Sequence, residues 1–207
     1  MKLLTLIVFS SLFYSITCSE PMLDFLNIQK THPEIDFKLT KECENSFDLI
    51  KKGIDENEIW AIKVLDASGR TQPGFVWGNS FWLGSKRACE MLNNPKRIPL
   101  PLSSSRLMLP HIPEIATKVP VEYRMFHASH TSPIQFDSDT FEFVGLHIGL
   151  CFPKACHEEE IKRMAEVVFQ SGEFKNTAIF GDVKFNMTRT LKLRENFFEE
   201  TAVRLLM

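Results

Sequence analysis

The stretch that most constrains the fold is Gly145–Gln170, which reads GLHIGLCFPKACHEEEIKRMAEVVFQ. Alternating apolar residues in its first half predict a strand that ends near Cys151. Apolar residues spaced three and four apart predict a helix in its second half, and the acidic run Glu158–Glu160 suits the positive end of the helix dipole. Because Cys151 and Cys156 flank the turn between these elements, disulfides can fix both the end of the strand and the start of the helix.

Residues 1–19 have the pattern of a secretory signal peptide. Lys2 precedes an apolar run from Leu3 to Ile16, and small or polar residues follow the run. This run is shorter than the roughly 20 apolar residues that span a membrane. We therefore expect a secreted, extracellular protein with no transmembrane span in the mature chain. An uncleaved membrane anchor is the alternative.

The cysteines predict a disulfide-stapled domain. Cys18 lies in the predicted signal peptide, which leaves Cys43, Cys89, Cys151 and Cys156. An even number of cysteines in an oxidising compartment predicts two disulfides, and four cysteines allow three pairings. Of these pairings we favour Cys43–Cys89 with Cys151–Cys156. A zinc site is the alternative, but C-x4-C has no second pair nearby, so we expect no metal and no cofactor.

Periodicity and capping residues predict an α+β domain over residues 40–190, with a small antiparallel sheet of about three strands and packed helices. Residues 20–39 contain two prolines and are expected to form an extended lead-in, whereas residues 191–207 are expected to form an amphipathic C-terminal helix. The further predicted helices are Lys41–Lys52 capped by Thr40, Glu58–Ala67 capped by Asn57, and a short helix to Asn93 capped by Ser85. The predicted strands are Val121–Ala128, Phe141–Cys151 and Ala178–Phe185.

Charge and missing motifs exclude several functions. With 24 basic and 26 acidic residues the formal net charge is −2, which gives no reason to expect a nucleic-acid partner. The chain has no nucleophile elbow, no H-E-x-x-H motif and no phosphate-binding glycine motif. We therefore expect no catalytic residue and no enzyme. His127 and His130 would point to opposite faces of a strand, so we interpret them as surface or satisfied histidines rather than metal ligands.

Aromatic residues supply the candidate binding residues. The 18 phenylalanines indicate either an aromatic core or an apolar ligand cavity. A glycine-rich stretch after residue 68 places Trp77, Phe81 and Trp82 between turns, and Trp60 lies in the predicted helix before it. We take these four residues as candidates for contact with a ligand or partner. Asn186 begins the N-x-[ST] sequon of the chain, and we expect a glycan there.

Three stretches occur in the order found in one extracellular family. The first, Trp60–Gly69, is close to W-A-x-K-x-x-D-A-S-G, and the second has Pro73-Gly74, Gly78-Asn79 and Leu83-Gly84-Ser85 before Cys89. The third, Gly149–Cys156, is close to G-x-C-x-P-x-x-C. Together with Cys43, these stretches resemble the nose-resistant-to-fluoxetine N-terminal domain. Two cysteines common in that family are absent here, one of them replaced by Arg124 after Tyr123.

The resemblance implies a non-catalytic module. In many relatives the module precedes a membrane acyltransferase domain, and we do not carry that activity over to this chain. The family's association with uptake implies that the module binds or helps to transport lipid-like or other hydrophobic small molecules. The alternative is an extracellular protein-interaction domain that acts on a membrane acyltransferase-type relative. We expect an enclosed cavity in the first case and an exposed aromatic patch in the second.

Overall fold

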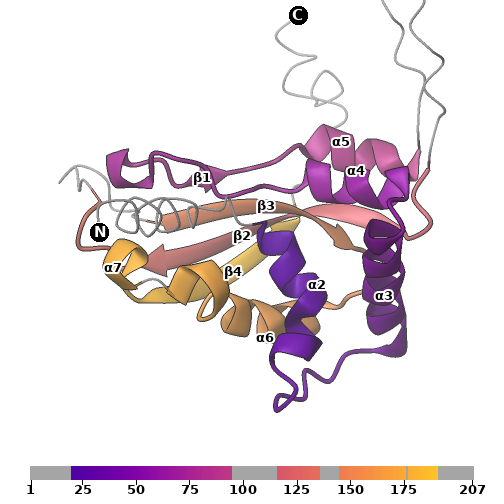
Figure 1. The fold of residues 1–207 in the computed structure, drawn as a ribbon, viewed down its shortest axis with the longest axis horizontal. Coiled ribbons are helices and arrows are strands. Elements are labelled where there is room, and N and C mark those ends of the chain that lie inside the picture. Colours follow the sequence, from indigo (N-terminus) through magenta and orange to yellow (C-terminus); the bar gives the residue numbers. More distant parts are fainter. Residues whose placement is uncertain (1–19, 95–115, 136–144, 176, 191–207) are drawn as a thin grey trace, which may run out of the picture.

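The computed structural model describes residues 20–94, 116–135, 145–175 and 177–190 (Figure 1). The predicted signal peptide and the predicted C-terminal helix over 191–207 lie outside the described residues. Within the described residues no helix is long and apolar enough to span a lipid bilayer.

A mixed sheet forms the centre of the fold, with the strand order β1-β3-β2-β4. Its strands are β1 Phe81–Trp82, β2 Val121–His130, β3 Gly145–Pro153 and β4 Val183–Thr190. β2 pairs antiparallel with both β3 and β4, and β1 pairs parallel with β3. The α+β class is confirmed, but the sheet has four strands rather than three. β1 is only two residues long, which is too short for an alternating pattern to reveal it.

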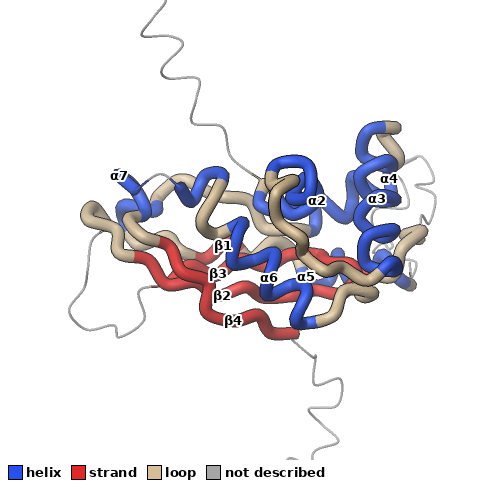
Figure 2. The backbone as a smooth tube through the Cα atoms, turned by 90° about the horizontal axis from the view of Figure 1, so that it is seen from below, coloured by secondary structure: helices blue, strands red, loops and turns tan. Residues whose placement is uncertain are grey.

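The helices are α2 Pro21–Thr31, α3 Lys41–Asp55, α4 Ile59–Ala67, α5 Lys86–Asn93, α6 Glu158–Val168 and α7 Thr177–Phe180. Two short 3-10 turns, η1 Phe75–Trp77 and η3 Gly172–Lys175, complete the described elements. Figure 2 shows α2, α3 and α7 on the same side of the sheet. The opposite face is covered at one end by α5, whose Asn93 exchanges two hydrogen bonds with the backbone of Val121.

Phenylalanines fill the core between the sheet and the helices. Phe25 of α2 packs on Phe126 of β2 and Phe152 of β3, with ring centroids 5.2 and 5.3 Å apart. A second group surrounds Trp82, whose ring lies 6.3 Å from that of Phe180. These side chains therefore account for much of the aromatic content as core packing.

Two predicted elements are wrong. The lead-in over residues 20–39 was expected to be extended, but it contains helix α2. Proline stands at the first position of this helix, where its missing N–H is not needed. The predicted strand Ala178–Phe185 begins as helix α7, and β4 starts only at Val183. Gly181 separates the two with a φ of 65°, a conformation that interrupts both helix and strand.

Two details of the predicted helix Glu58–Ala67 also differ. The helix begins at Ile59 with Glu58 as its N-cap, because Asn57 adopts a left-handed φ of 57°. Little of the circumference of this helix is polar, which predicts that it is buried, but Ile59 and Ile62 are exposed. By contrast, Thr40 and Ser85 cap their helices as predicted, and each hydroxyl accepts a backbone N–H three residues ahead.

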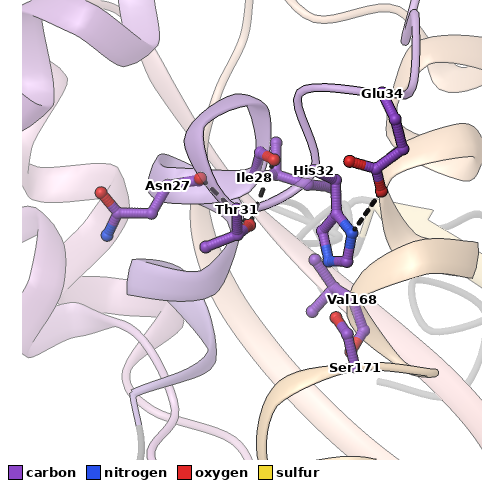
Figure 3. A network of polar contacts seen from close by, with 7 residues as sticks. All are labelled: Asn27, Ile28, Thr31, His32, Glu34, Val168 and Ser171. Carbon is purple, nitrogen blue, oxygen red and sulfur yellow. Dashed lines mark hydrogen bonds and ion pairs between the residues drawn. The ribbon is translucent and has the colours of Figure 1, made fainter.

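Helices α2 and α6 meet near their C-terminal ends (Figure 3). The Thr31 hydroxyl donates to the Asn27 and Ile28 carbonyls at 3.2 and 3.1 Å, and the Ile28 carbonyl also accepts the His32 N–H at the end of the helix. His32 Nδ1 lies 3.2 Å from a carboxylate oxygen of Glu34, and Figure 3 shows the ring beside Val168 of α6. This junction fixes the lead-in on the domain.

Candidate interaction surface

The two disulfides join helices to the organising strand and turn. Cys43 on α3 is bonded to Cys156, with Cα atoms 4.6 Å apart. Cys89 on α5 is bonded to Cys151 on β3, with Cα atoms 5.5 Å apart. All four cysteines are oxidised, but the pairing favoured from the sequence is wrong. The turn between Cys151 and Cys156 carries the two sulfurs to different neighbours, α5 and α3, so they do not meet each other.

The end of the Trp60–Gly69 motif holds the segment after α4 against β3. The Ser68 hydroxyl donates to the Val64 carbonyl at 3.0 Å and accepts the Cys151 N–H at 3.0 Å. The Gly69 N–H donates to the Gly149 carbonyl at 2.6 Å. These residues satisfy buried backbone groups, so their role is in folding rather than in chemistry.

Glu160 links the starts of two helices. Its buried carboxylate accepts the His157 N–H at the start of α6, at 2.6 Å, and the Thr40 N–H at the start of α3. Burial acts to raise the pKa of Glu160, but the hydrogen bonds from Thr40 and His157 outweigh it and hold the pKa below its usual value. The helix dipole alone explains an acidic first turn, and no local pattern reveals the contact between Glu160 and Thr40.

The disulfides and the hydrogen-bonded residues described above meet at one junction, which we call the stapled hub. Its members share fully buried or hydrogen-bonded positions at the junction of α3, α4, α5 and α6 with β3. They are Cys43, Cys89, Cys151, Cys156, Ser68, Gly69 and Glu160.

The candidate aromatic residues divide into two pairs. Trp60 is 3% exposed and Trp82 is 1% exposed, so both belong to the core. The Trp60 Nε1 donates to the Glu58 carboxylate, which satisfies its polar atom. Trp77, in contrast, is 88% exposed and Phe81 is 56% exposed. Only the second pair is placed to contact a partner at the surface.

A short turn presents Trp77 to solvent. Gly74 and Gly78 flank η1 with φ values of 98° and 92°, a conformation that favours glycine. The Gly74 carbonyl accepts the N–H groups of Trp77 and Asn79 at 2.9 and 3.0 Å. Phe75 anchors the turn, because its ring is buried 4.6 Å from the ring of Phe180. Because these contacts hold the turn, the Trp77 side chain does not need to pack against the domain and stays exposed to solvent.

A row of side chains crosses all four strands on the face that α5 leaves uncovered. Phe81 pairs with His147, His147 with His127, and His127 with Met187. The Phe81 and His147 rings are stacked at 4.5 Å, and the Nδ1 atoms of the two histidines are 2.7 Å apart. Met187 is 44% exposed. We call this surface the open face. The sequence suggested it only indirectly, through His147 alternating with the apolar residues of the strand.

The charge on the open face has one sign. Burial lowers the pKa of His127 and of His147, and the pKa of His127 is lowered further by His147 and by the cationic Arg189. Both rings are therefore uncharged at neutral pH. Exposed Lys184 and Arg189 lie on the same face, opposite Ser129 and Met125 of β2. The described strand positions on this face include no carboxylate.

Of two surface cavities in the described part of the chain, the larger has a mixed polar and apolar lining and the smaller a mostly polar one. One of about 560 Å³ is lined by residues that include Glu90, Asn93, Lys118, Glu122 and Lys154. Another of about 200 Å³ lies beside Asp36, Lys38 and Glu44. Neither offers the mostly apolar lining of a typical site for a hydrophobic ligand. The described residues also include no group of three or more His, Cys, Asp or Glu side chains placed to hold a metal ion.

The predicted glycan acceptor lies on the edge strand. Asn186 is exposed on β4, where the pairing with β2 is shifted between His127 and Ala128. Its Oδ1 accepts a hydrogen bond of 3.3 Å from the Ser129 hydroxyl. Its position on the surface is compatible with the expected glycan, which stays a prediction.

Comparison with known proteins gives one family. Residues 43–165 match the model of the nose resistant-to-fluoxetine protein, N-terminal domain. No curated protein and no solved structure matches the chain. The matched range contains the stapled hub, the Trp77 turn and the strands that carry both histidines of the open face.

Proposed function

Because this chain belongs to the family of the nose resistant-to-fluoxetine N-terminal domain, we propose that it is a secreted, non-catalytic module that binds another extracellular protein. Its two disulfides fit an oxidising, extracellular-type environment. The predicted signal peptide supports secretion, and N-terminal sequencing of the protein from culture medium tests it. A first residue near Glu20 is expected, whereas an intact Met1 contradicts secretion by cleavage.

One observation carries the proposal: exposed apolar side chains gather in the segment that contains η1 and β1. Within residues 76–83 the exposed large side chains are Val76, Trp77, Phe81 and Leu83. Residues 71–85 contain no charged residue. Exposed aromatic side chains on a rigid support are typical anchors of protein interfaces, because they bury a large area at little cost in conformational entropy.

The charges on the open face indicate the chemistry of the partner. Lys184 and Arg189 supply positive charge beside the aromatic row, and the described strand positions of this face supply no negative charge to balance them. We therefore propose a partner segment with apolar side chains for Trp77 and Phe81 and with carboxylates for the two cations. The sequence analysis suggested a membrane acyltransferase-type relative as the partner, and we include such a relative among the proposed partners.

The hydrophobic-ligand function predicted from the sequence stays a second proposal. Core phenylalanines such as Phe25, Phe126 and Phe152 pack on one another, and neither of the two cavities described above has a mostly apolar lining. These observations favour contact at the surface over enclosure of a lipid. Native mass spectrometry of the secreted protein, followed by lipid extraction, tests this alternative.

Selection from a displayed peptide library tests the main proposal. We expect the selected peptides to combine aromatic or aliphatic residues with Asp or Glu. Trp77→Ala and Phe81→Ala should each weaken their binding by roughly 2 kcal/mol or more, the effect of an interface anchor. Leu49→Ala is the matched control, because Leu49 is an exposed apolar residue on α3, away from the open face, and its loss should leave binding unchanged.

Three outcomes would contradict this assignment. Peptides without acidic residues would remove the proposed charge complementarity. Equal weakening by Leu49→Ala would show non-specific hydrophobic binding. Trp77-dependent binding to vesicles of phosphatidylcholine with phosphatidylserine, together with failure to select any peptide, would assign the surface to membranes instead.

A further inference from the structure

The two histidines of the open face lie almost as two ligands of one metal ion would. His127 and His147 are directly opposite each other on β2 and β3, with 2.7 Å between their Nδ1 atoms. Zinc holds imidazole nitrogens at about 2.0–2.1 Å, so two such ligands stand roughly 2.9–3.4 Å apart at ordinary coordination angles. To share one ion, the Nδ1 atoms need to separate by a few tenths of an ångström, and both rings must turn so that their lone pairs converge on the ion instead of facing each other. We propose that His127 and His147 together chelate Zn²⁺.

The neighbouring side chain limits the movement that binding requires. The Phe81 ring is stacked on His147 with an interplanar angle of 7°, so it restrains the orientation of that imidazole. The His127 ring stands at 83° to the His147 ring. In this contact one Nδ1 carries a proton and donates a hydrogen bond to the Nδ1 of the other ring. Binding requires that proton to move to Nε2 of the same ring, so that both Nδ1 lone pairs face the ion and no proton is lost from the pair.

The site is expected to be open and of modest affinity. Zinc usually takes four ligands, so two histidines leave positions for water or for an external group. Met187 on β4 is paired with His127, on the opposite side of β2 from His147. Its sulfur atom is a further potential ligand close to the two histidines. The cationic Arg189, which acts on His127, opposes the charge of the ion. Weak, readily reversible binding fits this balance, and it does not depend on the proposed protein partner.

Calorimetric titration with Zn²⁺ tests the proposal. The protein should carry no polyhistidine tag and should first be treated with a chelator. We expect saturable binding to the wild type. His127→Ala and His147→Ala should each weaken it at least about tenfold, since even the loss of an outer-shell partner costs roughly 10–100-fold. His32→Ala is the control, because this histidine lies away from the sheet beside Glu34, and it should bind as the wild type does.

A second measurement covers the case in which an alanine variant does not fold. In the wild-type protein, Zn²⁺ should perturb the imidazole NMR signals of His127 and His147 first and leave buried His130 unperturbed. Phe81→Leu should weaken binding less than loss of either histidine, because Phe81 only orients a ligand. Unchanged affinity in both folded histidine variants would overturn the proposal. So would Zn²⁺-dependent shifts confined to His32 or His157.

Discussion

The stapled hub and the open face use the same sheet in different ways. In the hub, Ser68 and Glu160 place each polar contact on a backbone group of another element, and two disulfides close the junction. On the open face, Phe81 and Met187 are exposed although they are large and apolar. The hub gains stability from every residue it uses, whereas the open face leaves apolar area in water that folding could have buried.

This difference separates the residues that identify the family from those that can serve its function. The D-A-S-G part of the motif binds α4 to β3, and the C-x-P-x-x-C part supplies one cysteine to each of the two disulfides. A motif made of such residues marks the fold. The binding function is therefore to be sought in neighbouring residues such as Trp77, which stabilise little and face solvent.

The largest effect should follow from Cys151→Ser with Cys156→Ser. These cysteines belong to different disulfides, so the double variant breaks both and leaves Cys43 and Cys89 without partners. Each native disulfide typically contributes about 2–5 kcal/mol, and a whole domain has only about 5–15 kcal/mol. We expect almost no variant protein in the culture medium, measured by immunoblotting.

Asn186→Gln is the control for secretion, and it should reduce the secreted amount less, because a glycan on the edge strand is peripheral to the core. Thiol labelling of the denatured, unreduced wild type should find no free thiol among the four hub cysteines. Stoichiometric labelling of Cys151 or Cys156 would contradict the disulfides and make a reactive thiol the better interpretation.

Gly69→Ala should be the next most damaging change. A Cβ atom at Gly69 would lie 1.8 Å from the Trp82 carbonyl oxygen, which belongs to the backbone of β1 and cannot turn away. We expect a loss of roughly 2–3 kcal/mol in the free energy of unfolding. Gly145→Ala, at the open-face end of β3, is the matched change, because its Cβ would meet the Ala128 carbonyl oxygen at 3.2 Å. Urea unfolding of both variants should show a smaller loss of unfolding free energy for Gly145→Ala. Equal losses would contradict the difference in packing between the stapled hub and the open face.

Glu160→Gln should have a moderate, pH-dependent effect. The carboxylate accepts N–H groups at two helix starts, and loss of a helix cap costs about 0.5–2 kcal/mol. Because folding lowers the pKa of Glu160, its contribution is complete above the unfolded pKa of about 4.3 and is lost as the pH falls through the lower folded pKa.

Unfolding free energies of the wild type and the variant at several pH values test this sign. The two proteins should differ most at neutral pH and converge in acid. Glu159→Gln is the control, since Glu159 is exposed, and it should change stability by a few tenths of a kcal/mol through the helix dipole. A difference between wild type and Glu160→Gln that grows in acid would show that the carboxylate does not act as a buried acceptor.

The smallest effect on stability should come from Trp77→Ala. Trp77 is 88% exposed, so its removal should change the free energy of unfolding by no more than about 0.5 kcal/mol. Phe75→Ala, two residues earlier in the same turn, removes a buried anchor and should cost about 3–5 kcal/mol. Thermal unfolding followed by circular dichroism compares them. A large loss for Trp77→Ala would make Trp77 a structural residue and weaken the case for it as an interface anchor.

Elements with strong local signals were predictable. The helix after Cys156 and the caps Thr40 and Ser85 agree with the sequence analysis, because periodicity and capping depend on nearby residues. Strand β1 was missed because two residues form a strand only when another strand is beside them. The lead-in was expected to be extended, but it forms α2, whose Phe25 is held by contacts with β2 and β3 from more than 100 residues away.

The sequence by itself determined the α+β class, the family resemblance and the oxidation of all four hub cysteines, since each depends on residue types and spacing along the chain. Only the tertiary structure decided which cysteines pair, which tryptophans are buried and which histidines meet. His147 approaches His127 across two strands, and Cys43 approaches Cys156 over a separation of 113 residues. The packing of the whole domain brings these residues together, and no local sequence pattern predicts these contacts.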